Sequence, residues 1–179
     1  MATKVSLRQF QQDLAQRLSS AKTAPVSAAR LGVQCGASYW LIALEDAGEI
    51  VPVPDLLPVP LSKPWYLGLA NIRGSLFSVV DFSAFAVGEL TARSADSRLV
   101  LAGPRFGINS ALLVSRMLGL RNARDLQPVV DDSQGEVAGA WSGQAWREAA
   151  AGDAAAARVW RELKFEHLIE SPDFLNVGL

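Results

Sequence analysis

The chain has 179 residues, half of them hydrophobic and a fifth charged, with a formal net charge of −1 at pH 7. This length favours one domain with a sizeable core, and the charge argues against a nucleic-acid-binding protein. No run approaches the roughly 18 apolar residues of a membrane-spanning helix, and residues 1–24 lack a secretory apolar block. The single cysteine, Cys35, excludes an intrachain disulfide and suits a cytoplasmic location.

An amphipathic helix is predicted over residues 6–20. Its apolar residues recur at spacings of three and four, which places them on one face: Leu7, Phe10, Leu14 and Leu18. A linker follows, so we predict a helix and linker over residues 1–28 and a globular domain over 29–179. The first thirty residues hold five basic residues against Asp13 alone, a net charge of +4. A basic helix of this kind suits an anionic membrane surface, a transit peptide or a solvated helix face, and we favour the last, without membrane insertion.

The middle of the chain predicts short β-strands. Residues 31–36 and 38–44 form two strands around a turn at Gly36, and residues 65–82 form a hairpin. Five prolines between residues 52 and 64 predict an edge strand or loop, because proline removes a ladder donor. A further strand pair is predicted at residues 97–103 and 108–117. Many short strands separated by turns indicate a mainly β fold, either a barrel or a sandwich.

The last third of the chain gives weaker signals. The alanine-rich stretch 145–159 predicts a short helix or helical loop, interrupted at Gly152. We then expect a strand at residues 159–165 and a short helix at 166–171 that ends before Pro172. Trp141 and Trp146 lie in a polar context and are candidates for a contact patch.

Groups suited to catalysis are scarce. The chain has one histidine, His167, and one cysteine, and it lacks the ligand spacings of zinc sites, a phosphate-binding loop and a nucleophile elbow. We interpret His167 as an ordinary surface residue rather than a phosphoacceptor. We interpret Cys35 as a buried structural thiol. Asp131, Asp132 and Glu136 suit a polar loop better than a cation site. We therefore predict no enzyme activity, cofactor, metal or small-molecule substrate; a hydrolase with an unrecognised Asp and Ser site is the remaining enzymatic alternative.

The residues that carry most information lie in the predicted hairpin. Gly68 precedes Asn71-Ile72-Arg73-Gly74, and an apolar run then ends at Asp81-Phe82. The turn presents Arg73, which either pairs with a local carboxylate or anchors an interface through its planar guanidinium. This pattern resembles the central motif of the CheW-like family, adaptors that link bacterial chemoreceptors to a histidine kinase. Three positions depart from the family pattern, which has leucine where Ile72 stands, proline where Ser78 stands and aspartate where Ser115 stands.

The resemblance implies a structure and a function. The implied fold is two linked five-stranded SH3-like β-barrels with a short C-terminal helix. The implied function is a cytoplasmic adaptor between a methyl-accepting chemoreceptor and a CheA-type kinase, in chemotaxis or, as in the PilI-type branch, in twitching motility. Arg73, Asn71 and Gly74 would contact the receptor, and Glu49 and Ile50, in the segment Ala47–Ile50, the kinase. The alternative is a β-barrel interaction or assembly module unrelated to a kinase.

Overall fold

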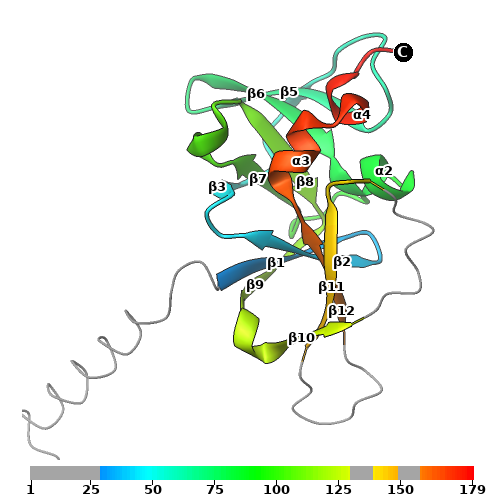
Figure 1. The fold of residues 1–179 in the computed structure, drawn as a ribbon. Helices are drawn as coiled ribbons and strands as arrows, with labels where there is room; N and C mark the ends of the chain where they lie inside the picture. The colour runs from blue at the N-terminus through cyan, green and yellow to red at the C-terminus, as the bar shows by residue number, and fades with distance from the viewer. Residues whose placement is uncertain (1–28, 130–138, 149–157) are drawn as a thin grey trace, which may run out of the picture.

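The computed structural model describes residues 29–129, 139–148 and 158–179 (Figure 1). Within them the chain is mainly β and forms two sheets, as the sequence predicted, although each sheet has six strands rather than five. Sheet A has the strand order β10-β11-β12-β2-β1-β9, and sheet B the order β3-β7-β8-β6-β5-β4. The predicted N-terminal helix and the linker lie outside the described residues.

Sheet B is inserted in sequence between the strands of sheet A. The strands of sheet A are β1 (Ala29–Cys35), β2 (Ser38–Ala43), β9 (Arg116–Asn122), β10 (Leu126–Val129), β11 (Ser142–Glu148) and β12 (Val159–Leu163). Those of sheet B are β3 (Ala47–Pro52), β4 (Leu56–Leu57), β5 (Tyr66–Ile72), β6 (Ser75–Asp81), β7 (Arg98–Ala102) and β8 (Ser110–Val114). The helices are α2 (Phe82–Val87), α3 (Phe165–Glu170) and α4 (Pro172–Leu175), with short 3₁₀ turns η2 (Pro104–Phe106) and η3 (Ala123–Asp125). None of the described helices is long and apolar enough to cross a membrane.

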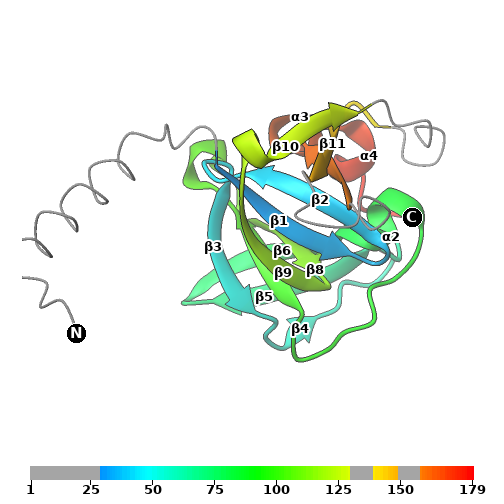
Figure 2. The same ribbon diagram turned by 90° about the horizontal axis from the view of Figure 1, so that it is seen from below.

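The main hydrophobic core lies between the two sheets and draws on both of them. Three aromatic rings contact one another there: Trp40 of β2 lies 5.1 Å from Phe82 and 5.7 Å from Trp141, measured between ring centroids. Trp141 is only 6% exposed, so the prediction that it forms a surface contact patch is wrong. Figure 2 shows β1, β2 and β9 from the lower end of the molecule, with sheet B behind them. Packing of large rings at this junction holds the sheets together.

Two smaller cores lie elsewhere in the sheets. One is lined by residues of sheet B, including Ile72, Val79 and Leu113, and the other by Leu41, Leu126 and Trp160 of sheet A. The half-buried Trp146 packs against this second cluster, so it also contributes to the packing of sheet A. Both helices at the end of the chain close onto the central core through buried side chains: Phe165 and Leu168 from α3, and Phe174 from α4.

Several predicted elements are confirmed and two are corrected. The two strands around Gly36, the hairpin of residues 65–82 and the short helix before Pro172 are present. The stretch 108–117 is two strands, because the backbone N–H of Ser115 donates to Gln34 of β1 and the chain crosses there from sheet B to sheet A. The helix expected from residue 145 onward is wrong for Ala145–Glu148, which belong to β11. Pairing with β10 and β12 overrides the helical propensity of alanine there; residues 149–157 lie outside the described part of the chain.

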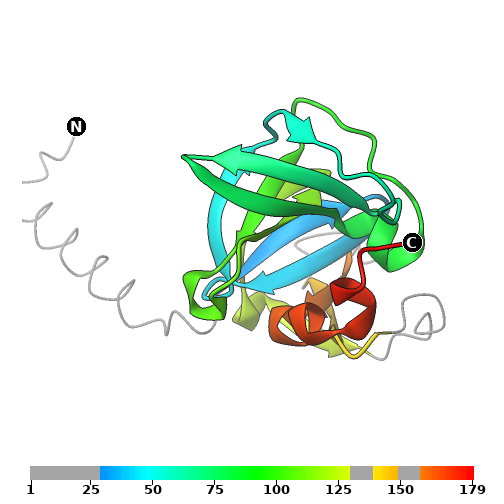
Figure 3. The same ribbon diagram turned by 90° about the horizontal axis from the view of Figure 1, so that it is seen from above.

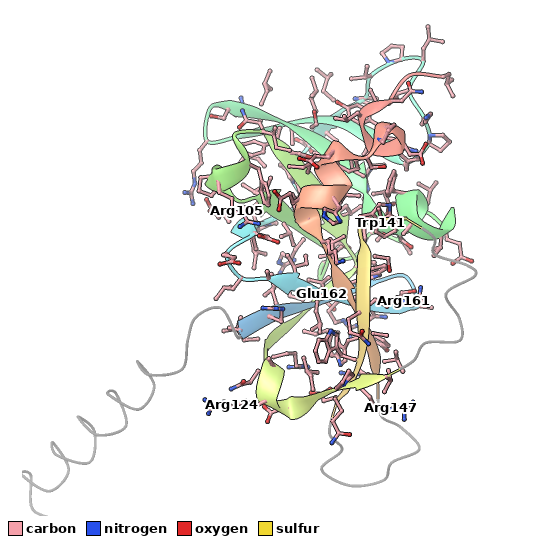
Figure 4. The ribbon with its side chains drawn as sticks, viewed as in Figure 1. Arg105, Arg124, Trp141, Arg147, Arg161 and Glu162 are labelled. Carbon is pink, nitrogen blue, oxygen red and sulfur yellow. The ribbon has the colours of Figure 1, made fainter. Side chains whose placement is uncertain are left out.

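The start of β3 is held by Asp46. Its backbone accepts a hydrogen bond from the N–H of Gly103, and its carboxylate forms a 2.6 Å ion pair with Arg105, which lies beside β3 (Figure 4). The Asp46 side chain is 8% exposed, whereas that of Arg105 is 45% exposed. Burial raises the pKa of the Asp46 carboxyl, and the charge of Arg105 opposes that shift. The direction in which β3 leaves this turn therefore depends on a buried carboxylate with a half-exposed partner.

The close approach of β4 to β5 should depend on the absence of a side chain at Gly68. The residue has φ +112°, and a Cβ there would overlap the carbonyl oxygen of Leu57. We expect Gly68→Ala to lower the free energy of unfolding by more than about 2 kcal/mol in urea denaturation. Gly88→Ala is the matched control, because φ is +79° but nothing lies within 4 Å; its cost should be about 1 kcal/mol. Equal costs would show that Gly68 provides backbone freedom alone.

The Asp46 ion pair predicts a pH-dependent effect of Arg105→Ala. Because burial raises the folded pKa of Asp46, its ionisation lowers stability as the pH rises through that pKa. Loss of Arg105 makes the ionised form still less favourable, so the variant should lose about 1 kcal/mol near pH 7. The loss should shrink as the pH falls through the pKa of Asp46. In an Asp46→Asn background Arg105→Ala should have little effect at either pH; a loss that does not change with pH would contradict this account.

Candidate functional site

The β5–β6 hairpin ends in a two-residue turn formed by Arg73 and Gly74. Ile72 pairs with Ser75, and the two turn residues have φ +53° and +86°. Positive φ at both positions is the geometry of a type I′ turn, whose twist matches that of the flanking strands. The side-chain oxygen of Asn71 accepts a 2.9 Å hydrogen bond from the N–H of Gly74. Asn71 and Gly74 therefore shape the turn, and Arg73 is presented at its tip.

Arg73 reaches across to the opposite edge of sheet B. Its guanidinium forms a 2.5 Å ion pair with Glu49 of β3, although three strands separate β3 from β5 in the sheet order. Sheet B must therefore curl until its β3 edge meets the hairpin. Figure 3 shows the hairpin projecting away from the end of the chain marked C. The Arg73 and Glu49 side chains are 77% and 40% exposed, so solvent screens the pair and it contributes little to stability.

Two exposed apolar residues neighbour the members of this ion pair along their strands. Ile50 follows Glu49 in β3 and is 39% exposed, and Leu76 of β6 pairs in register with Asn71 and is 59% exposed. A charged pair beside exposed apolar residues on a rigid turn is suited to binding another protein. We call this the hairpin surface and define it by Glu49, Ile50, Asn71, Arg73, Gly74 and Leu76. Leu76 was missed in the sequence, although alternation along β6 places it on the face opposite the buried Val79.

The five residues predicted from the sequence come together at this one place. The sequence assigned Arg73, Asn71 and Gly74 to one partner and Glu49 and Ile50 to another, on separate surfaces. The structure joins Arg73 to Glu49, so these two sets share a surface. The pairing of Arg73 with a local carboxylate, which the sequence left open, is present. The Arg73 side chain is highly exposed, so its guanidinium also remains accessible to a partner.

A hollow of about 380 Å³ lies where the chain crosses between the sheets. It is lined by Asp96, Arg98, Arg116 and Met117. Arg98 donates 2.7 Å hydrogen bonds to the carbonyls of Ala95 and Ser97, which fixes its side chain. Arg116 lies 3.6 Å from Asp96, and both side chains are more than half exposed. This hollow has a mixed charge and belongs to the junction of the two sheets.

The other chemically interesting residues do not form a reactive site. His167 is exposed on the six-residue helix α3, with Nδ1 3.1 Å from the carbonyl oxygen of Ala140. Cys35 is 2% exposed, and burial, reinforced by the charge of Asp81, raises the pKa of its thiol. In the described residues no three His, Cys, Asp or Glu side chains are grouped to hold a metal. The acidic residues Asp131, Asp132 and Glu136 lie outside those residues.

The buried motif residue Asp81 has a structural role. One carboxylate oxygen accepts hydrogen bonds from the backbone N–H groups of Ser83 and Ala84 and so caps α2. The two oxygens also accept from the hydroxyl and the N–H of Thr91, each at 2.7 Å. Asp81 therefore ties the end of β6 to α2 and to the loop beyond it.

Comparison with known proteins gives a consistent result. The CheW-like domain family matches residues 30–152. Protein PilI of Pseudomonas aeruginosa is 27% identical over 109 residues, a match that spans 61% of each chain, so about three fifths of that relative's length is covered. The crystal structure of the scaffolding protein TtCheW from Thermoanaerobacter tengcongensis superposes with a TM-score of 0.61 at 16% identity, over 79% of this chain and 87% of that one.

The structural likeness supports the two-sheet fold, and the family match covers well over half of the chain, including β2 to β11 and the whole hairpin surface. The chain belongs to the CheW-like domain family.

Proposed function

We propose that this protein is a non-enzymatic cytoplasmic adaptor that couples a methyl-accepting chemoreceptor to a CheA-type histidine kinase. The observation that carries the proposal is the hairpin surface, an exposed ion pair presented by a type I′ turn, with apolar neighbours, on a CheW-like domain. An adaptor needs surfaces rather than reactive groups, and the rigid core between the sheets would hold those surfaces at fixed positions.

The hairpin surface would contact both partners. Arg73, positioned by Asn71 and Gly74, would bind the receptor, and Glu49 with Ile50 would bind the kinase. The ion pair between Arg73 and Glu49 makes this arrangement compact, because the two contacts meet at one point. The helical tip of the receptor would extend from there toward the hollow at the junction of the sheets, which Arg98 and Arg116 border.

A shared ion pair offers a physical route for coupling. A partner that draws Arg73 away from Glu49 changes the charge that the second partner meets. Coupling between two binding sites requires such differential contacts in two states. The exposed pair is weak, so exchanging it for a partner's carboxylate requires little free energy.

The pathway is proposed from the similarity to PilI. On that basis we place the protein in the branch of chemosensory systems that control twitching motility by type IV pili. We further propose that residues 1–28 form a separate amphipathic helix and linker and that residues 29–179 form the CheW-like domain.

Substitutions in the hairpin surface test these roles. We expect Arg73→Ala to weaken receptor binding by about 30-fold, or about 2 kcal/mol, as removal of an interface anchor does. Glu49→Gln should weaken kinase binding by a similar factor. Both melting temperatures should stay near that of the wild type, because the pair is exposed. The measurements are calorimetric titrations of each variant with a receptor tip fragment and with the kinase regulatory domain.

Arg93→Ala is the matched control, an exposed arginine in the loop after α2, and it should change neither affinity. If Arg73→Ala and Glu49→Gln weaken the same partner only, the surface serves one partner and the assignment of the other is wrong. If both variants are folded and neither affinity changes, the hairpin surface is not the binding site of the proposed adaptor. A β-barrel assembly module unrelated to a kinase would bind neither protein even in the wild type.

A further inference from the structure

The alternation of side chains along β3 reverses partway through the strand. Ala47 packs against the main core between the sheets, whereas Val51 packs against the smaller core of sheet B. These two residues are four positions apart, so in a regular strand their side chains would lie on the same face of the sheet. The strand must therefore contain one extra residue between them.

The pairing of β3 with β7 locates the extra residue. The register between the two strands shifts by one residue between Ala47 and Ile50. Within that shift Gly48 and Glu49 lie opposite the single residue Leu101 of β7. Two residues opposite one is the pattern of a β-bulge, which redirects the side chains of the strand that contains it. The bulge therefore lies at the residue that forms the ion pair with the hairpin.

The bulge decides which side chain of β3 faces the hairpin turn. If β3 paired regularly from Ala47 onward, Glu49 would lie on the face of Ala47, and Ile50 would take its place on the other face. The bulge instead places Glu49 on the face of Val51, where its carboxylate meets the guanidinium of Arg73. The position of the charged group in the hairpin surface thus depends on the backbone at Gly48 and Glu49.

Gly48 permits the bulge because it has no side chain. A Cβ at this position would lie 2.9 Å from the carbonyl oxygen of Ala102 and 3.3 Å from that of Leu101, both backbone atoms of β7. The φ angle of Gly48 lies outside the left-handed region, so the residue is needed for its small size rather than for an unusual dihedral angle. Any larger residue must push β3 away from β7 at the bulge.

A second close approach fixes β3 just before the bulge. The N–H of Gly103 donates a 2.7 Å hydrogen bond to the carbonyl of Asp46, and Arg105 pairs with the carboxylate of the same residue. A Cβ at Gly103 would lie 2.8 Å from that carbonyl oxygen. Two glycines, one on each side of the strand pair, therefore let β3 approach β7 closely on either side of Ala47.

We propose that Gly48 is a positioning residue, because the bulge that it permits aims the Glu49 carboxylate at Arg73 in the hairpin surface and so presents it to the kinase. The proposal rests on the proposed role of Glu49 in kinase binding. The ion pair itself cannot supply this positioning, because it is exposed and contributes little to stability. The close backbone packing of β3 on β7 supplies it instead.

Calorimetric titration of the full chain with the kinase regulatory domain tests the proposal. Gly48→Ala should weaken kinase binding by about 10-fold, because the displaced carboxylate no longer meets its partner. Gly32→Ala in sheet A is the matched control, since a Cβ there would lie 2.9 Å from the ring of Trp160. It should lower the melting temperature but leave kinase affinity unchanged. An equal loss of affinity in both variants would show that lowered stability weakens binding, and would overturn the proposal.

A double variant shows whether Gly48 acts through Glu49. Two residues that act through one contact have effects that do not add in free energy. The double variant Gly48→Ala/Glu49→Gln should therefore bind the kinase about 30-fold more weakly than the wild type, the same factor as for Glu49→Gln alone. Independent effects would multiply to about 300-fold, and that result would contradict a positioning role.

Nuclear Overhauser contacts between the side-chain protons of Glu49 and Arg73 give a measurement that needs no partner. These contacts should be present in the wild type and in Gly32→Ala and absent in Gly48→Ala. If Gly48→Ala does not fold, Gly103→Ala, which displaces the start of the same strand, should lose them instead. Contacts that persist in the folded variant overturn the proposal. If the contacts are lost but Glu49→Gln binds the kinase normally, the proposed function of Glu49 is wrong, while the bulge still positions its carboxylate.

Discussion

The packing of Trp40, Phe82 and Trp141 between the two sheets is the interaction on which the rest of the structure depends. Each ring comes from a different part of the chain: β2, the start of α2, and the residue before β11. The two smaller cores each stabilise one sheet, but this cluster fixes the sheets relative to each other. Without it the hairpin surface and the hollow lined by Arg98 and Arg116 would have no defined separation, and the proposed adaptor role depends on such a separation.

Local sequence patterns predicted those parts of the fold that depend on interactions between residues close in sequence. The hairpin turn is encoded locally. Gly74 tolerates positive φ, and the side-chain oxygen of Asn71 accepts a hydrogen bond from the N–H of Gly74. The segment Ala145–Glu148 was mistaken for helix because alanine propensity is local, whereas its strand pairing with β10 and β12 depends on residues distant in sequence. The break at Ser115 was missed for the same reason, since its partner Gln34 lies in β1.

The candidate site shows the same division between local and distant information. Residues on the hairpin and on β3 were found separately, through their resemblance to a known motif. No local pattern indicates that Glu49 and Arg73 meet, because their contact arises from the curl of sheet B across three intervening strands. Trp141 was misjudged because polar neighbours in sequence say nothing about burial, and the partners that exclude water from it, Trp40 and Phe82, come from other elements.

Two kinds of exposure on sheet B carry different meanings. Around Arg73 the positive backbone angles belong to a favoured hairpin turn, so folding itself explains the geometry and only the exposed ion pair points to a partner. At Leu61 the positive angle is unfavourable for the residue that occupies it, and the side chain gains no burial in return. That turn is nonetheless held from within the fold, because the Ser62 hydroxyl donates to the carbonyl of Val59 and the N–H of Leu179 donates to the carbonyl of Leu61. The exposed ion pair on the hairpin is for that reason the stronger physical sign of a binding surface.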